Sequence, residues 1–498
     1  VPQVMKRFVI KDENHVPPFN QPANELTIGT RPLRFYHEEL INDYFEDKDY
    51  ELQYAGNLDN RMQVFRIQRR TSSQHVGSAS NGMYWLDENE SAIVYRDSLW
   101  FDREFLDYFI KKAEENTFER ENEDGTVETL IRAGRAAVYA EDDCYKTYSY
   151  RLAHNLEESY LEDGKTKIYL LDMWYLPRGF TPDITTIMIP SDSKQKGFYT
   201  VPDFMATEPG DLTHYLPARS VLFIETWFHV YVAAIIFGVF ARASRVDEDI
   251  ASSNLKKLRL LWQAVLEQKQ VLATSKMVEV GRGTTIHPTA IVTGPAKIGE
   301  YCNIGPGVVI DNCTIGDNVT IDTGSVVSLS TIADGCFLPF NSSLFMTALM
   351  ENTIVAQNTC LQMCVVGRNS FIGAGNTFTD FNLIGLVDEQ DSLRTVPRPI
   401  GAANADTRIE DTGQTVLGGA VGHNCRLGSG LIVFPGRMIE SDVVMFASPQ
   451  RRVVSRSIAF EESDHHYVKG GADAQIRNHP RPGELSVEEQ QRLEEWED

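Results

Sequence analysis

The chain has few basic residues for its length. Its 498 residues include 47 Lys and Arg against 70 Asp and Glu, a formal net charge of −23. Nucleic acids and anionic membranes are bound through Lys and Arg, so this balance argues against both as partners. The length is enough for two or three domains with sizeable cores.

Cysteine is also scarce. There are seven cysteines, an odd number, and six of them lie between residues 302 and 425. We therefore expect no disulfide framework and a reducing, cytoplasmic location. No signal peptide is visible at the start of the sequence, which is consistent with this expectation.

The sequence lacks a hydrophobic run of the length that crosses a bilayer. The most apolar stretch, residues 226–241, holds 16 uncharged residues between Glu225 and Arg242, fewer than the roughly 20 that are needed. We expect a buried helix, or one shared between subunits, and membrane association is the less favoured alternative. A second helix, with Lys256, Lys257 and Arg259 on its solvent side, completes a helical connector over residues 221–277; its apolar positions are Leu255, Leu258, Trp262, Val265 and Leu266.

A six-residue period is the strongest pattern that the sequence does contain. Between residues 280 and 445 aliphatic residues return every six positions, with occasional slips, and Gly or a small or acidic residue often follows them. A period of six is neither helical nor simply alternating, so it indicates a repeated strand-plus-turn unit. One such unit cannot bury its apolar residue alone, but stacked coils of three units bury a continuous column. Members of the ladder are Val292, Ile298, Ile304, Ile310, Ile315, Ile321, Val327, Ile332, Leu338, Leu344, Val421, Leu427, Val433 and Ile439.

This repeat resembles the hexapeptide-repeat, left-handed β-helix family of acyltransferases. The resemblance implies an all-β solenoid over residues 278–447, association into a homotrimer, and acyl-CoA as a co-substrate. The hexads fade between residues 385 and 415, where a Pro- and Gly-rich polar stretch predicts an inserted loop. A tail over residues 448–498 is expected to end in a short helix with a capping box at Ser486 and Glu489.

Residues 1–220 predict a separate α/β domain. Apolar runs at residues 7–10, 64–67, 137–139 and 168–171 indicate strands, and Asp102 is the expected N-cap of a helix with Phe105 on its buried face. The segments 24–33 and 97–102 resemble degraded pieces of the nucleotidyltransferase domain in bifunctional glucosamine-1-phosphate acetyltransferase/uridylyltransferase proteins. Active domains of that kind have a phosphate loop with Lys, and the fragment at residues 29–32 has none. The domain is therefore expected to serve packing or recognition.

The most informative short motif surrounds His423 and Asn424 in the hexad region. The resemblance to hexapeptide acyltransferases that act on amino sugars places a His followed by Asn or Asp at such a turn. An amine must lose a proton when it attacks a thioester, and imidazole titrates near neutral pH. We expect both side chains to point outward from the solenoid, with His423 as the general base and Asn424 orienting the substrate. The alternative is an ordinary solvent-facing turn histidine.

Two arginines follow the last predicted coil. Arg451 and Arg452 resemble the coenzyme A phosphate-binding end of acetyltransferase β-helices, although an exit segment can also use arginines for surface pairing. No metal is predicted, because the repeat offers only His287 and His423 as histidine ligands.

The sequence therefore predicts an enzyme that moves an acyl group from acyl-CoA or acyl carrier protein to an amine of a sugar or sugar nucleotide. Two alternatives stay open. One is a non-catalytic trimeric scaffold, and the other is a sugar-1-phosphate nucleotidyltransferase whose site lies in the first domain.

Overall fold

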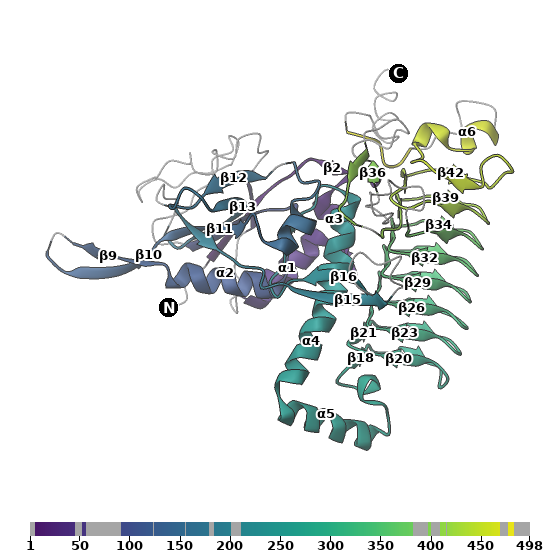
Figure 1. Ribbon diagram of the computed structural model, residues 1–498, viewed down its shortest axis with the longest axis horizontal. Coiled ribbons are helices and arrows are strands. Elements are labelled where there is room, and N and C mark those ends of the chain that lie inside the picture. Colours follow the sequence, from purple (N-terminus) through teal and green to yellow (C-terminus); the bar gives the residue numbers. More distant parts are fainter. Residues whose placement is uncertain are drawn as a thin grey trace.

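The computed structural model contains an N-terminal α/β domain, a long helix, and a C-terminal β-solenoid, which lie side by side (Figure 1). It describes residues 5–44, 52–55, 91–122, 124–154, 156–178, 184–200, 211–381, 397–399, 409–414, 416–468 and 477–482. The expected strand at residues 64–67 and the capping box at Ser486 and Glu489 lie outside these residues.

A mixed sheet of seven strands forms the centre of the N-terminal domain. Its strand order is β14-β11-β13-β7-β1-β6, with β12 also paired to β13. The strands are β1 (Met5–Ile10), β6 (Leu52–Ala55), β7 (Ser91–Arg96), β11 (Ala133–Tyr139), β12 (Glu157–Tyr160), β13 (Lys167–Leu176) and β14 (Ile184–Met188). The predicted strands at residues 7–10, 137–139 and 168–171 are thus confirmed. The burial pattern agrees, because all six residues of β7 are buried, as expected of a central strand.

Short hairpins and helices surround this sheet. Helix α2 (Arg103–Glu115) begins as predicted, with the Asp102 side chain accepting a hydrogen bond from the Phe105 N–H. The other helices of the domain are η1 (Ala23–Glu25), α1 (Leu33–Tyr44) and η3 (Tyr145–Ser149). The paired strands are β2 (His15–Val16) with β3 (Gln21–Pro22), β4 (Thr27–Ile28) with β5 (Arg31–Pro32), β8 (Leu99–Phe101) with β17 (Val221–Phe223), β9 (Thr117–Glu121) with β10 (Val127–Ile131), and β15 (Lys194–Thr200) with β16 (Asp211–Leu216).

The connector contains one long helix, which we call the central helix. It runs over Trp227–Ser252 and consists of α3 (Trp227–Tyr231), the π-helical η4 (Val232–Phe240) and α4 (Ala241–Ser252). It is long and apolar enough to span a bilayer, yet 89% of its most apolar window is buried inside the chain. The prediction of a buried helix at residues 226–241 is therefore confirmed for the single chain. Helix α5 (Asn254–Glu267) and η5 (Val271–Ala273) lead from it to the solenoid.

Three parallel sheets of eight strands each form the solenoid. The chain visits them in turn, so each coil contributes one strand to each sheet. Sheet 1 contains β18 (Val278–Val280), β21 (Ala296–Ile298), β24 (Thr314–Ile315), β27 (Thr331–Ile332), β30 (Ala348–Leu349), β33 (Val365–Val366), β38 (Ala420–Val421) and β41 (Met438–Ile439). Sheet 2 contains β19 (Thr285–Ile286), β22 (Asn303–Ile304), β25 (Thr320–Ile321), β28 (Phe337–Leu338), β31 (Ile354–Val355), β34 (Phe371–Ile372), β39 (Arg426–Leu427) and β42 (Val444–Met445). Sheet 3 contains β20 (Ile291–Thr293), β23 (Val309–Asp311), β26 (Val326–Ser328), β29 (Ser343–Phe345), β32 (Cys360–Gln362), β35 (Thr377–Phe378), β40 (Ile432–Val433) and β43 (Val453–Val454).

The predicted ladder of sixes forms the core of the solenoid. Its aliphatic residues pack together in the interior, with Val292 at the partly buried first coil. Cys302, Cys336 and Cys425 are buried beside them. A hairpin of β36 (Pro397–Pro399) and β37 (Ile409–Asp411) lies within the predicted insertion, and η6 (Phe460–Glu462) and α6 (His465–Val468) follow the last coil.

The outer face of sheet 1 is covered by the central helix. Ala348, Val365, Ala420 and Met438 alternate with interior residues, and they belong to the same cluster of buried residues as Ile235 of the helix. Sheets 2 and 3 instead expose outward residues such as Phe337 and Ile291. One of the three faces of the solenoid is therefore an internal domain interface.

The environment of helix α5 differs from the one that the sequence predicts. The sequence places Lys256, Lys257 and Arg259 on its solvent side, but the apolar residues Leu258 and Trp262 are also 64% and 63% exposed. Only Leu260 and Ala264 of this helix are buried. The helix packs on the rest of the chain through a narrow stripe and leaves its wide apolar face open.

Candidate functional site

The N-terminal segment, residues 18–31, follows one corner of the solenoid, between sheets 1 and 2. Turn residues of successive coils contact it in reverse order. The Ser441 hydroxyl donates to the Pro18 carbonyl at 2.9 Å, Arg368 Nη2 donates to the Glu25 carbonyl at 2.5 Å, and the Thr27 hydroxyl donates to Glu351. The corner where catalytic side chains were predicted is thus occupied by the start of the chain.

His423 lies on this corner, and its side chain is fully buried. The Phe19 ring lies on one side, with ring centroids 5.1 Å apart, and the His479 ring lies 5.0 Å away. The alternative of a solvent-facing turn histidine does not hold in this structure, because Phe19 and His479 cover the ring. The role of His423 as the general base stays a prediction. The turn itself is as predicted, since Asn424 has the positive φ of 55° that such turns require.

Hydrogen bonding fixes the tautomer of His423. Its Nδ1 accepts the Arg368 backbone N–H at 3.0 Å, so the remaining ring proton of a neutral imidazole must be on Nε2. Among the residues that the structure describes, the buried Nε2 has no hydrogen-bond partner. Burial, together with the charge of Arg368 and the neighbouring His479, holds the pKa of His423 well below its usual value. In this arrangement the ring is a neutral hydrogen-bond donor, and it has no free nitrogen lone pair to accept a proton.

Charged hydrogen bonds to Glu440 hold residues 477–482 of the C-terminal tail beside His423. Glu440, whose side chain is fully buried, accepts hydrogen bonds from Arg477 at 2.7 Å and from Arg481 at 2.6 Å. Asn20 donates to the same carboxylate at 2.9 Å. Asn424 donates to Asp442 at 2.9 Å, so its amide is engaged within the solenoid.

A cavity of about 370 Å³ opens where the central helix diverges from the first coils of the solenoid. The outward residues Lys297, Thr314 and Thr331, from consecutive strands of sheet 1, form one wall. Segments 28–31 and 100–104 form another, so the two stretches that resemble nucleotidyltransferase fragments meet here. We call this space the interdomain cleft.

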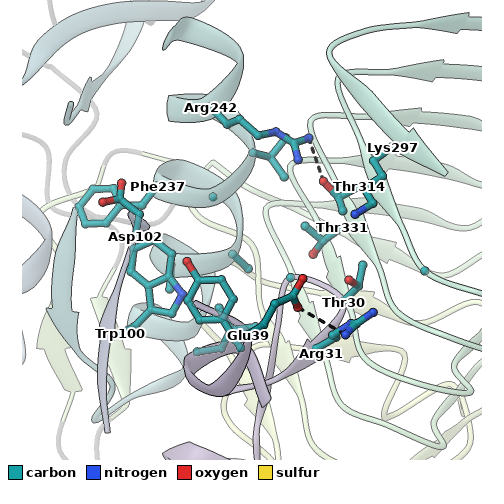
Figure 2. Close-up of a pocket in the computed structure, with 18 of the residues that line it drawn as sticks. Thr30, Arg31, Glu39, Trp100, Asp102, Phe237, Arg242, Lys297, Thr314 and Thr331 are labelled. Atoms are coloured by element: carbon teal, nitrogen blue, oxygen red, sulfur yellow. Dashed lines mark hydrogen bonds and ion pairs between the residues drawn. The ribbon is translucent and has the colours of Figure 1, made fainter. Parts of the chain in front are cut away.

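Two cations in the cleft form no salt bridge among the described residues, although the charge of Glu279 acts on Arg242 and Glu279 is the strand neighbour of Lys297. Arg242 reaches from the central helix to the Thr314 hydroxyl, with Nη2 at 2.9 Å, and Lys297 lies on the same wall (Figure 2). Among the described residues, neither makes an ion pair, and the buried Nε of Arg242 has no hydrogen-bond partner. Burial lowers the pKa of Arg242. A partly buried guanidinium with an unused donor favours an anionic ligand.

The other charges of the cleft are mostly paired with one another. Arg31 pairs with Glu39 at 3.4 Å, and Arg245 pairs with Asp102 at 3.1 Å. Burial raises the pKa of Asp102 to about 6. Asp102 also accepts the Phe105 and Ser220 N–H groups, so its oxygens serve the helix cap and the ion pair.

Aromatic side chains form the wall opposite the solenoid. Trp100 and Tyr36 stack with ring centroids 6.1 Å apart and an interplanar angle of 7°, and Phe237 lies 6.2 Å from Trp100. Figure 2 shows Trp100 and Phe237 across the cleft from Thr314 and Lys297. The cleft thus has an aromatic wall and, on the solenoid side, a polar wall that contains Lys297 but also Asp317 and Asp334. An anionic group of a ligand would therefore have to bind beside Arg242 and Lys297.

The structure does not bring the predicted site residues together. His423 follows β38, three strands above β27, so it lies at least about 14 Å along the solenoid from the cleft. Arg451 pairs with Asp464 at 3.0 Å, and Arg452 donates to the Gly430 carbonyl at 3.1 Å. Neither contact forms a phosphate clamp, and coenzyme binding there stays a prediction. Within the described ranges, no group of three or more metal-binding side chains is placed to hold an ion.

Sequence reasoning missed Arg242 and Lys297 as ligand-binding residues. In the sequence, Arg242 only marks the end of an apolar run. Lys297 occupies an outward position of a hexad, which carries no signal of its own.

Comparison with known proteins supports the assignment of a six-residue repeat. Residues 277–312 match the family described as bacterial transferase hexapeptide (six repeats). The chain is 27% identical over 177 residues to the bifunctional protein GlmU of Thermotoga sp. (strain RQ2), covering 33% of this chain and 37% of that protein. It is 34% identical over 87 residues to GlmU of Geotalea uraniireducens (strain Rf4), covering 17% and 19%. The chain thus spans little more than a third of these relatives at most.

Solved structures overlap with parts of the chain. A GDP-perosamine N-acetyl transferase from Caulobacter crescentus, in complex with CoA and GDP-perosamine, is 20% identical, with 33% of this chain and 54% of that chain covered and a TM-score of 0.14. A hexapeptide transferase family protein from Anaplasma phagocytophilum is 15% identical, with 35% and 81% covered and a TM-score of 0.15. The three eight-stranded parallel sheets form a β-solenoid, and its first coils match the hexapeptide repeat of bacterial transferases.

Proposed function

We propose that this chain is an acyltransferase that moves an acyl group from acyl-CoA or acyl carrier protein to an amine of a sugar or sugar nucleotide. Its hexapeptide-repeat β-helix supports acyl transfer as the reaction class. The observation that carries the assignment of a ligand site is the presence in the interdomain cleft of two cations, Arg242 and Lys297, that make no ion pair among the described residues.

A phosphate group is the ligand feature that these two residues fit. The Arg242 guanidinium presents donors in a fixed fork, and the Lys297 ammonium adds a mobile point charge. Coenzyme A and sugar nucleotides both carry phosphates, and both also have a ring system that the Trp100 wall can contact. The cleft would therefore hold the phosphate end of one substrate, and its other end would reach His423 only in a state in which residues 18–31 have left the solenoid corner.

The reaction itself needs a proton acceptor. The amine nitrogen forms a bond to the thioester carbonyl carbon, the carbon–sulfur bond breaks, and the amine proton passes to a base before the thiol leaves as its protonated form. His423 remains the proposed base. It can act only in a state in which its Nδ1 no longer accepts the Arg368 N–H and in which Phe19 and His479 have moved off the ring.

The covered state of His423 favours a second candidate, a non-catalytic scaffold that keeps the cleft for ligand recognition. Its imidazole is locked as a donor by the Arg368 N–H and is enclosed by Phe19. An enzyme and a scaffold would both bind a phosphate-bearing ligand, but only the enzyme would release a free thiol from the acyl thioester.

Both properties can be measured on the full chain. Isothermal titration with coenzyme A and, separately, with UDP tests the cleft, and thiol release from acetyl-CoA with amino-sugar acceptors tests the chemistry. We expect Lys297→Ala to weaken binding by about tenfold or more, because a charged hydrogen bond contributes about 1.5–3 kcal/mol. Arg282→Ala, an exposed position at the same end of the solenoid, is the matched control. Unchanged affinity in Lys297→Ala would refute the assignment of the cleft as the ligand site. Ligand binding without thiol release would favour the non-catalytic scaffold over the acyltransferase.

A further inference from the structure

Helix α5 exposes a continuous apolar face on an acidic protein. Six of its residues that favour an apolar environment are between 52% and 75% exposed, and Leu272 in the following turn is 45% exposed. They are Leu255, Leu258, Leu261, Trp262, Val265 and Leu266. Isolated exposed apolar residues are common on soluble proteins, but a contiguous face of this kind marks an interaction surface.

Helix geometry points this face away from the solenoid. Leu260 and Ala264 bury the opposite side, where Leu260 packs with Met277 and Val278 of the first coil. Leu258 and Trp262 are each two residues from Leu260, which places them about 200° around the helix from it. Figure 1 shows α5 below the end of α4, at the end of the molecule where the first strands β18 and β20 lie. The apolar face therefore looks outward from one end of the molecule.

The segment around this face is locally basic. Lys256 pairs with Asp249 and Lys269 pairs with Glu267, which leaves Lys257, Arg259 and Lys276 without an ion pair among the described residues. Residues 254–276 contain five basic residues and one acidic residue, Glu267, whereas the chain as a whole has a net charge of −23. The basic residues are Lys256, Lys257, Arg259, Lys269 and Lys276. Lys257 and Arg259 lie on the two flanks of the apolar arc. An apolar stripe that contains Trp and Leu and is flanked by cations is typical of helices that lie in a membrane interface.

A second copy of the chain fits this face less well. The apolar positions of α5 extend over only two heptads of a 14-residue helix, and helical seams of stable coiled coils are longer. Two α5 helices in contact would also bring like charges from Lys257 and Arg259 together. The clustering of positive charge therefore selects an anionic occupant.

We propose that α5 is a peripheral membrane anchor, which lies in the surface of an anionic lipid bilayer with Leu258 and Trp262 inserted and Lys257 and Arg259 at the headgroups. The first coils of the solenoid would then face the bilayer, because α5 lies at that end of the molecule. The net charge of the whole chain argues against a membrane partner. That net charge does not reveal the locally basic composition of α5. The contact is monotopic and does not require any helix to span the bilayer.

Vesicle flotation with the purified full chain tests this proposal. The probes are vesicles of pure phosphatidylcholine and vesicles with 30% phosphatidylserine. We expect binding to the anionic vesicles, weaker binding at high salt, and little binding to the neutral ones. The double substitution Leu258→Ser, Trp262→Ser should reduce binding by tenfold or more, and Lys257→Gln by about fivefold. Val127→Ser, at a 62% exposed position in the N-terminal domain, is the matched control.

Three results would overturn the proposal. One is the absence of binding to anionic vesicles, and another is equal binding by the wild type and the Leu258/Trp262 variant. The third is a variant that binds vesicles normally but changes the oligomeric state in sedimentation velocity, because the face would then be a contact between chains. Circular dichroism and thermal melting of the variant should match the wild type, since both side chains are already in water.

Discussion

His423 is kept neutral by the segments that lie on top of it. Phe19 and His479 enclose the ring, and the Arg368 N–H occupies its only acceptor nitrogen. The Phe19 contact joins residues that are 404 positions apart, whereas Arg368 and His479 lie 55 and 56 positions from His423. A hexad pattern locates the turn, but it carries no information about which distant segment covers it.

Substitution of His423 should therefore affect stability. We expect His423→Ala to lower the free energy of unfolding by about 2 kcal/mol, because the buried Arg368 N–H loses its acceptor and a void is left beside Phe19. Urea denaturation of both proteins measures this difference. The exposed residue His287 provides the control, and His287→Ala should change stability by less than about 0.5 kcal/mol.

The same site predicts a pH effect. The folded pKa of His423 is depressed below its usual 6.5, so below pH 6.5 the unfolded state binds a proton that the folded state does not bind. Stability is therefore lost as the pH falls from about 6.5, and His423→Ala should lose less over the same range. Parallel pH profiles of the two proteins would contradict this account.

At the scale of elements, the environment of the central helix is predicted best from the sequence, and the environment of α5 is predicted worst. An uncharged run of 16 residues predicts burial whatever lies against it, and the structure buries nearly all of it. The sequence does not show that sheet 1 is its partner, or that Val232–Phe240 is a π-helix. The amphipathic pattern of α5 is correct, but a pattern alone cannot show whether a partner within the chain covers the apolar face.

These two helices provide a matched pair of substitutions. Ile236→Asp should destabilise the chain by several kcal/mol, because it places an unpaired carboxylate in the core between the central helix and sheet 1. Leu258→Asp on α5 adds the same charge at a 64% exposed position and should have little effect. Thermal melting of both variants makes the comparison, and equal melting temperatures would contradict the assigned environments.

At the scale of the whole molecule, the repeat period predicts the solenoid closely, and its strands run from Val278 to Val454. The candidate site is predicted much less well. A period reports which residues point inward, whereas the cleft depends on how Arg242 of the helix meets the outward Thr314 and Lys297. The sequence of the helix alone, or of the repeat alone, does not show that these residues come into contact.

The predicted homotrimer can be tested on the basis of this architecture. Sheet 1 is already covered by the central helix, so contacts between subunits would have to use sheets 2 and 3, where Phe337 and Phe371 are exposed. We expect light scattering to give a mass of about 170 kDa, three times the 56.1 kDa of the chain. Phe337→Ser combined with Phe371→Ser should shift the mass towards that of one chain. A monomeric wild type would rule the trimer out.

The path of the N-terminal segment along the corner also determines the order in which the molecule can be completed during synthesis. Pro18 accepts hydrogen bonds from Ser441, a residue made 423 positions later. Coils of the solenoid can stack on one another as they leave the ribosome, because each needs only its neighbour. Pro18 and Phe19, in contrast, have no docking surface on the solenoid until the coil of Ser441 exists, whereas residues 5–10 pair with β6 and β7 and Thr27 contacts Glu351 of an earlier coil. This short segment is made long before its solenoid partner, so it reaches its final place only after the last coils have been made.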